Sequence, residues 1–310
     1  MRFGGHQTFY IREGWLYKGM DLLINHPERF EDPLVFDHLG VGKNMAMSIV
    51  YWLEATGLAI KEQSKADSRA KILKPTDLGR LVHKNDPYFT REETWWILHI
   101  NLVANRESAE TWYWFFNELG TDRFIREQGF KRFQKYIEND LKGRKPTQKT
   151  AERDLSCLIN TYAINLPNTI TDPEEDIWCP FRDLELLVSY KSTGHHVIQR
   201  RRRSIPVYIV LYALETSLQL SPNYHLESYE NDNILDIRFF DLVRLPNNPQ
   251  RVFALHNDGF FELLNNISES VLNTGLTIMG LAGERQIRIL RKPKFQFAES
   301  MYNAKEVKNG

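Results

Sequence analysis

Cysteine and long apolar runs are scarce in this sequence. Its 310 residues contain two cysteines, Cys157 and Cys179, which are too few for a disulfide scaffold or a zinc ribbon. No apolar run reaches the length that crosses a membrane. The first residues, Met-Arg-Phe-Gly-Gly-His, lack the apolar segment of a signal peptide. We therefore expect a cytoplasmic protein, not bound to a membrane, with both thiols reduced.

The sequence also lacks net charge, because 40 basic residues balance 40 acidic ones. A protein that coats nucleic acid without regard to sequence is normally basic throughout. Here the basic residues gather locally: residues 38–84 contain eight lysines and arginines against four acids, and residues 123–153 contain ten against four. Any contact with nucleic acid must therefore be made by limited surfaces of a neutral protein.

Motifs typical of enzymes and cofactor sites are missing as well. The sequence has no GxGxxG or Walker motif, no HExxH, His-x-His or CxxC set, and no Ser/His/Asp or paired-carboxylate pattern. His195 and His196 are adjacent, and neighbouring side chains of a strand point to opposite faces, so such pairs rarely bind one metal ion. We expect a protein that is not an enzyme, with no catalytic residue, no cofactor and no metal.

The most informative pattern begins at residue 34. A short helix is expected over residues 34–39, with Gly40 and Gly42 in the tight turn that follows. Residues 43–54 have apolar side chains at helical spacing, which predicts a second helix with one buried face. Gly57 is placed to end that helix.

Two short strands and a third helix complete the pattern. Strands are expected over residues 59–63 and 71–74, joined by a polar hairpin, and Thr76 is well placed to cap the next helix. Helix, turn, helix, two-stranded wing and helix is the order of a winged helix-turn-helix. That order points to nucleic acid rather than to a small substrate.

A winged unit that binds DNA inserts the first turns of its second helix into the major groove. The side chains expected to be exposed there are Lys43, Asn44, Met47, Ser48 and Tyr51, while Met45, Ile49, Trp52 and Leu53 form core. Asparagine reads adenine, and lysine reads guanine or contacts phosphate. On the wing, Lys65, Arg69 and Lys71 are expected at the backbone or minor groove. The alternative is a winged domain that binds only protein.

The N-terminal motif Phe-Gly-Gly-His-Gln-Thr-Phe allows two interpretations. Gly4 and Gly5 before His6 permit the close backbone approach that an anion or a partner needs. The interpretation that we favour is an arm tucked against the body, with the glycines in a turn and His6 hydrogen-bonded.

The densest basic run consists of Arg200, Arg201, Arg202 and Arg203. Adjacent arginines are costly unless they are neutralised. One alternative is a second DNA contact that grips phosphates, and the other is pairing with the acidic stretch at residues 172–185.

Apolar periodicity along the chain predicts a mostly helical protein with small β wings, of the α+β class. Aromatic residues between positions 95 and 116 predict two packed helices. Residues 124–141 predict a further helix, residues 180–218 a second unit resembling a winged helix, and residues 287–291 a strand.

We divide the sequence into four parts by composition and pattern. The arm and winged unit occupy residues 1–85, and an aromatic-rich helical region occupies residues 86–145. A second helical module, expected to resemble a winged helix, follows over residues 146–220. Residues 221–310 form a C-terminal α+β module.

Several motifs together resemble an uncharacterised bacterial family, a numbered domain of unknown function. The resemblance spans nearly the whole chain. It is carried by the Phe-Gly-Gly-His-x-Thr-Phe opening, Arg12, Trp15, the Leu-Gly-Val-Gly-Lys-Asn-Met segment from Leu39, the Trp-Tyr-Trp-Phe-Phe-Asn segment from Trp112, and the Cys179-Pro180 pair. Met47 departs from the basic residue expected in many relatives, which weakens the case for groove contacts by that position.

The resemblance implies genes of DNA phosphorothioation and related phage-defence systems nearby, often with a protein like phosphoadenosine-phosphosulfate (PAPS) reductase. It supplies no catalytic residues. We expect a non-catalytic DNA-binding component that presents or selects double-stranded DNA for such a sulfur-transferring partner. Two alternatives are a scaffold that binds the reductase-like protein and a transcriptional regulator of the defence operon. A net surplus of four charges on the winged unit favours a second basic surface or a homodimer.

Overall fold

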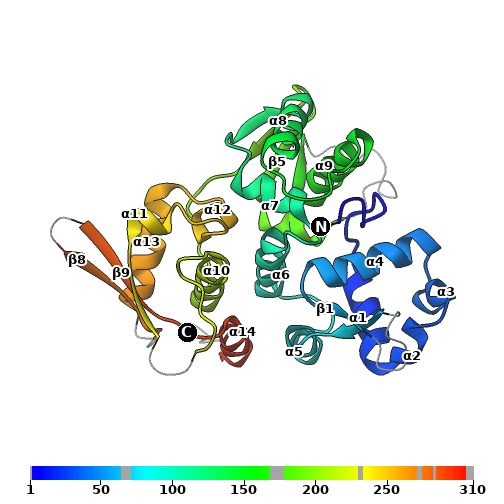
Figure 1. Cartoon of the computed structure of the whole chain (residues 1–310), viewed down its shortest axis with the longest axis horizontal. Helices are drawn as coiled ribbons and strands as arrows, with labels where there is room; N and C mark the ends of the chain where they lie inside the picture. Colours follow the sequence, from blue (N-terminus) through cyan, green and yellow to red (C-terminus); the bar gives the residue numbers. More distant parts are fainter. Residues whose placement is uncertain are drawn as a thin grey trace. The chain divides into compact units, whose positions relative to one another are not determined.

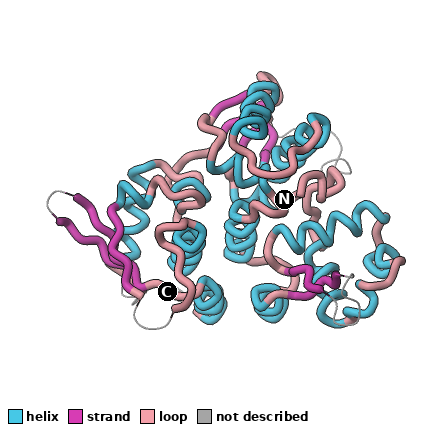
Figure 2. Tube along the Cα trace, in the orientation of Figure 1, coloured by secondary structure: helices cyan, strands magenta, loops and turns pink. Residues whose placement is uncertain are grey.

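The computed structural model describes residues 2–63, 71–167, 178–229, 233–270, 274–281 and 284–304. These residues form helices and three small sheets, an α+β architecture (Figure 2). The chain divides into two compact units, Met1–Gln199 and Arg200–Gly310. The four expected parts are finer than this division, and the part expected over residues 146–220 contains the dividing point.

The first unit begins with five helices and a hairpin (Figure 1). The helices are α1 (Trp15–Asn25), α2 (Pro27–Phe30), α3 (Val35–Leu39), α4 (Lys43–Ala55) and α5 (Asp77–Asn85). Strands β1 (Ala59–Gln63) and β2 (Lys71–Pro75) pair antiparallel, with Ala59 opposite Pro75 and Gln63 opposite Lys71. The expected helices and strands of this segment are therefore present.

Local sequence signals explain where these elements end. Gly57 has φ 77°, and Leu58 N donates to Leu53 O while Gly57 N donates to Glu54 O. These two bonds form a Schellman motif, which satisfies the last carbonyls of α4. Thr76 caps α5 by accepting a hydrogen bond from Gly79 N at 3.0 Å. Both signals were predicted from the sequence and are confirmed.

The centre of the first unit is an aromatic core carried by four helices: α6 (Glu92–Ala104), α7 (Glu110–Asn117), α8 (Arg126–Asn139) and α9 (Gln148–Tyr162). Trp96, Trp112 and Trp114 are all at most 2% exposed. His99 of α6 is buried in this core, where its Nδ1 is hydrogen-bonded to Tyr162 Oη at 2.8 Å. The predicted pair of aromatic helices is confirmed, as α6 packs on α7.

A four-stranded mixed sheet completes the first unit and departs from expectation. Its order is β3 (Arg123–Ile125), β6 (His195–Ile198), β5 (Leu187–Tyr190) and β4 (Ala163–Leu166), with β4 and β5 parallel. The helix expected from residue 124 begins at Arg126 instead, because Phe124 lies in β3. The second unit resembling a winged helix was expected to begin at residue 180, where a 3₁₀ turn, η1 (Pro180–Leu184), is found.

The described residues of the second unit form five helices and an antiparallel sheet. The helices are α10 (Val207–Leu220), α11 (Phe239–Leu242), α12 (Pro249–Val252), α13 (Asn257–Ser268) and α14 (Lys294–Asn303). The sheet has the order β7 (Ile234–Arg238), β9 (Glu284–Leu290) and β8 (Leu276–Leu281). Helix α10 packs on α14, and the predicted strand near residue 287 is confirmed. No helix among the described residues is long and apolar enough to cross a membrane.

Candidate nucleic-acid interface

The N-terminal end of α4 exposes a small polar surface. Lys43 and Asn44 form the first turn of the helix, and both are exposed. Gly42 precedes them without a side-chain cap, so the amide groups of the first turn are open to a ligand that accepts hydrogen bonds. Met47, one turn further, is 43% exposed. Three of the five side chains expected on this surface are therefore exposed.

Ser48 and Tyr51 are not exposed, which corrects the expectation for them. Ser48 is 0% and Tyr51 is 1% exposed. The hydroxyl of Tyr51 donates to the carbonyl of Ser108 at 3.0 Å, and burial raises the pKa of this phenol well above its usual value. A second chain segment covers this face of α4, so neither side chain is available to DNA in this structure.

The covering segment is the N-terminal arm (residues 2–13). Its guanidinium at Arg2 lies over the Tyr51 ring, 5.5 Å from the centroid, and Gly5 packs directly on the same ring. A Cβ at Gly5 would stand 2.4 Å from Tyr51 Cδ2, so only glycine fits. The close backbone approach expected from the glycine pair is therefore to Tyr51.

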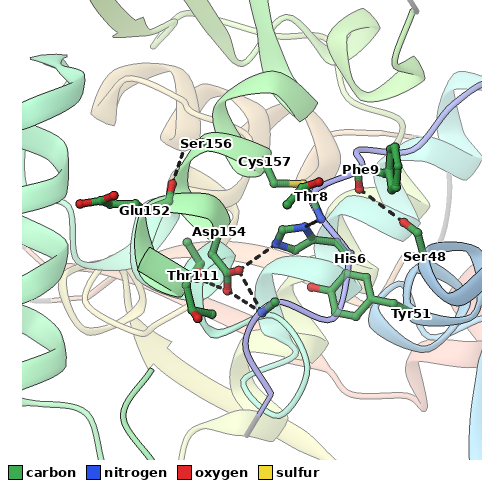
Figure 3. A network of polar contacts seen from close by, with 12 residues as sticks. His6, Thr8, Phe9, Ser48, Tyr51, Thr111, Glu152, Asp154, Ser156 and Cys157 are labelled. Carbon is green, nitrogen blue, oxygen red and sulfur yellow. Dashed lines mark hydrogen bonds and ion pairs between the residues drawn. The ribbon is translucent and has the colours of Figure 1, made fainter. Parts of the chain in front are cut away.

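Asp154 on α9 anchors the arm through a buried network (Figure 3). One carboxylate oxygen accepts from Gly4 N at 3.0 Å and from His6 Nε2 at 2.8 Å. Thr8 N donates to His6 Nδ1 at 3.0 Å, which requires the neutral tautomer with its proton on Nε2. The tucked-in arm that the sequence favoured is the arrangement found.

The His6–Asp154 pair resembles the histidine–carboxylate pair of catalytic triads, but its surroundings are closed. The two side chains are only 1% and 4% exposed. Cys157, the neighbouring thiol of α9 in Figure 3, has its pKa raised well above its usual value by burial and by Asp154. A neutral, buried thiol is a poor nucleophile, so this cluster holds the arm in place.

The same arm contains two adjacent residues with a strained backbone. Gln7 and Thr8 have φ angles of 51° and 71°, in the left-handed region that β-branched residues such as threonine rarely occupy. Each such residue costs about 1–3 kcal/mol. The arm adopts this conformation because the contacts of His6 and Gly4 with Asp154 hold it.

The hairpin beside α4 contributes fewer available cations than the sequence count indicates. Lys61 is paired with Glu54 at 2.7 Å, and Lys74 is paired with Glu62 at 2.8 Å. Lys71 is exposed, and within the described residues it has no ion pair. The expected wing residues Lys65 and Arg69 lie outside the described residues. Of the cations predicted to contact DNA in the winged unit, Lys43 and Lys71 are therefore the described ones that remain available to a polyanion.

The arginine run lies at the start of the second unit. Arg202 pairs with Glu262 of α13 at 3.1 Å, rather than with a described residue of the acidic stretch. Arg201 and Arg202 are exposed, and Arg200 and Arg203 are half-buried. The backbone of Arg201 is fixed by a hydrogen bond from its N–H to Ala254 O at 3.1 Å.

Of the adjacent histidines of β6, His196 has a side-chain hydrogen-bond partner, whereas Nδ1 of His195 is buried without one among the described residues. His196 Nδ1 is 2.5 Å from the hydroxyl of Ser189, and burial, with Arg126 and His195 nearby, lowers its pKa below the usual value. Across the part of the chain that the structure describes, no three His, Cys, Asp or Glu side chains are grouped to hold a metal ion.

Comparisons with known proteins identify a family and a fold. The model of a family described as a protein of unknown function (DUF4007) matches residues 3–304. Two crystal structures of SspB are similar, one of them with magnesium bound. The magnesium-bound structure is 24% identical and the other 23%; each has a TM-score of 0.82 and covers 98% of this chain and 90% of the SspB chain. No curated protein matches.

Proposed function

The chain belongs to DUF4007, a family of proteins of unknown function, and on that premise we propose that it is a DNA-binding, non-catalytic component of a bacterial DNA phosphorothioation or related phage-defence system. We interpret α3, α4, β1, β2 and α5 as a winged helix-turn-helix. The observation that carries this proposal is the exposure of Lys43 and Asn44 in the first turn of α4, where neither has an ion pair with a described residue. In a winged unit, that turn reads base edges in the major groove.

The type of system is the one that the sequence resemblance implies. A non-catalytic DNA-binding component in that setting presents double-stranded DNA to a sulfur-transferring protein like PAPS reductase, or selects the site. The second basic surface in this proposal is the arginine run, where Arg201 and Arg202 are exposed. Because the protein has no net charge, its affinity for DNA must come from such local contacts.

Salt-dependent binding of a fluorescent duplex tests DNA contact. Each lysine–phosphate contact contributes about 0.9 to the slope of log affinity against log salt. The double variant Lys43→Ala/Lys71→Ala is therefore expected to bind more weakly and to lower this slope by about 1.8. Over a fourfold rise in salt, this change reduces the loss of affinity by roughly tenfold.

The matched control is Lys61→Ala/Lys74→Ala, which removes the same number of charges, both of them from the hairpin beside α4. Because these lysines are paired with Glu54 and Glu62, we expect its slope to stay close to that of the unmodified protein. Equal salt slopes for the two double variants would show that DNA binding depends only on the total charge of the protein and not on contacts by Lys43 and Lys71. Absence of duplex binding at low salt would refute the proposal.

The same experiment tests the non-catalytic role. One of the similar SspB structures contains magnesium, so the duplex is incubated with the protein with and without this ion. We expect the strands to remain intact on a denaturing gel. Magnesium-dependent nicking or cleavage by the purified protein would contradict the non-catalytic assignment.

Exposed apolar side chains on the same elements favour a second candidate, a protein-binding scaffold. Leu34, Met47 and Ile60 are 52%, 43% and 51% exposed, and exposed apolar side chains are available for contacts with a protein. The scaffold predicts that Ile60→Ser reduces co-purification of the reductase-like protein, whereas Lys43→Ala does not. The third candidate, an operon regulator, predicts preference for the system's own promoter.

A further inference from the structure

A cavity of about 420 Å³ lies in the first unit, away from the first turn of α4. It is formed by the end of the N-terminal arm and the start of α1, the loop after α5, the first turns of α6, and η1. Its size falls within the range of small-ligand sites. Its lining includes the side chains of Arg12, Tyr17, Tyr88, Glu92, Trp178 and Asp183.

Aromatic side chains form the walls of this cavity and remain accessible. Tyr17 and Tyr88 lie with ring centroids 4.9 Å apart and planes at 39°, and Tyr88 is 67% exposed. Trp178 is 41% exposed. The guanidinium of buried Arg182 lies 5.7 Å from the Trp178 ring centroid and also donates to Asn160 O. The indole therefore rests on a fixed support.

The cavity also has a cation without a charged partner. The Arg12 guanidinium lies 5.5 Å and 5.3 Å from the ring centroids of Phe9 and Trp15. Within the described residues, no carboxylate pairs with it. A half-buried guanidinium that lies against two rings is placed in advance for an anionic group.

Carboxylates at the cavity supply negative charge and hydrogen-bond acceptors. Glu92 and Asp183 are exposed and line it. One oxygen of Asp183 is 3.4 Å from Trp178 Nε1, and one oxygen of Glu92 accepts from Trp96 Nε1 at 2.9 Å. Each carboxylate retains further acceptor capacity for the amino group of a ligand.

We propose that this cavity binds one unstacked nucleotide whose base carries an exocyclic amino group. The base stacks on Tyr88 and Trp178, its amino group donates to Asp183 or Glu92, and Arg12 binds the phosphate. Every base has a π face that suits aromatic walls. A quaternary ammonium ligand would be repelled by Arg12, and an inorganic anion would be repelled by the carboxylates and leave the aromatic walls unused.

Two sources can supply such a nucleotide: a single strand of DNA or a free nucleotide. Binding of a nucleotide that belongs to a DNA strand rests on the proposed DNA-binding function, whereas binding of a free nucleotide does not. The two sources share the same base and phosphate chemistry, so the experiment contains an arm for each.

The test uses a five-nucleotide DNA strand with 2-aminopurine at its centre, titrated with the full-length protein. Stacking in the cavity is expected to quench the fluorescence of 2-aminopurine. Tyr88→Ala and Trp178→Ala are each expected to weaken binding by roughly 5- to 150-fold, the range for loss of one base–aromatic stack. Tyr88→Phe keeps the ring and is expected to bind as the unmodified protein does.

Competition with free nucleotides provides the second arm. Deoxyadenosine monophosphate should compete better than thymidine monophosphate, which lacks the amino group, and better than deoxyadenosine, which lacks the phosphate. The matched control is Phe240→Ala, an aromatic residue of the second unit that is 55% exposed. This control should leave quenching unchanged.

The outcomes separate this inference from the proposed function. Duplex binding without 2-aminopurine quenching, or quenching that survives both Tyr88→Ala and Trp178→Ala, overturns the nucleotide cavity alone. Free-nucleotide competition without any duplex binding supports the cavity and refutes the DNA-binding function. Equal competition by adenine and thymine nucleotides overturns the role of the carboxylates and with it the proposal as stated.

Discussion

Replacing Asp154 by alanine removes the acceptor that holds the N-terminal arm on α9. Gly4 N and His6 Nε2 would lose their partner, and His6 is 1% exposed in the folded protein. A buried donor without a partner costs about 1–3 kcal/mol. The strained backbone at Thr8 would also lose the contacts that maintain it. We expect the free energy of unfolding of the first unit to fall by about 3 kcal/mol.

Tryptophan fluorescence is a selective probe for this experiment. All seven tryptophans lie between positions 15 and 178, inside the first unit, so urea unfolding followed by their emission reports that unit alone. A loss of about 3 kcal/mol lowers the urea midpoint by about 1 M or more. Asp154→Asn keeps the shape of the side chain but has one acceptor oxygen fewer, so it should lower the urea midpoint by an intermediate amount.

The control is Asp140→Ala, which removes an exposed carboxylate after α8. Exposed substitutions usually change stability by less than about 0.5 kcal/mol. If Asp154→Ala shifted the midpoint no more than this control, the arm would not depend on the Asp154 network. Trypsin sensitivity at Arg2 and Arg12, increased only in the Asp154 variants, would locate the effect in the arm.

Two further predictions concern buried groups. Burial raises the pKa of Cys179 to about 12 and that of Cys157 well above its usual value. Both thiols should therefore resist a disulfide reagent at pH 8 until urea unfolds the first unit. Fast labelling of the native protein would contradict this prediction. A Cβ at Gly79 would stand 2.1 Å from Leu58 O, so Gly79→Ala should lower the free energy of unfolding by about 3 kcal/mol. The control Gly42→Ala, with no atom within 4 Å of its Cβ, should change it by less than 1 kcal/mol. Equal urea midpoints for the two variants would refute the close approach of Gly79 to Leu58.

Local elements were predictable because their signals are local. The end of α4 follows from Gly57, and the start of α5 follows from Thr76, each within a few residues of the element that it bounds. The strands β4 and β5 were missed because each has four residues and too few positions to show a period of two. Their parallel pairing depends on contacts far apart in the chain.

The candidate interface was predictable only in part, for a related reason. Periodicity identified the face of α4 that carries Ile49 and Trp52, both 0% exposed. It did not show that a separate segment buries a second face, where Ser48 and Tyr51 lie. That segment is held by a residue 148 positions away from His6, and no pattern in one sequence indicates such a pairing. The glycine at position 5, where a side chain would clash with Tyr51, is the local feature of the sequence that reflects this packing.

The pairing of His6 with Asp154 has a consequence for synthesis on the ribosome. The arm leaves the ribosome before its acceptor, which follows 148 residues later, and this interval takes roughly 7–30 s at bacterial elongation rates. During that interval α4 can form while the ring of Tyr51 still lacks its cover. The emerging chain therefore passes through a period in which this aromatic face is open to chaperones or to a partner already present, and arrival of α9 ends it.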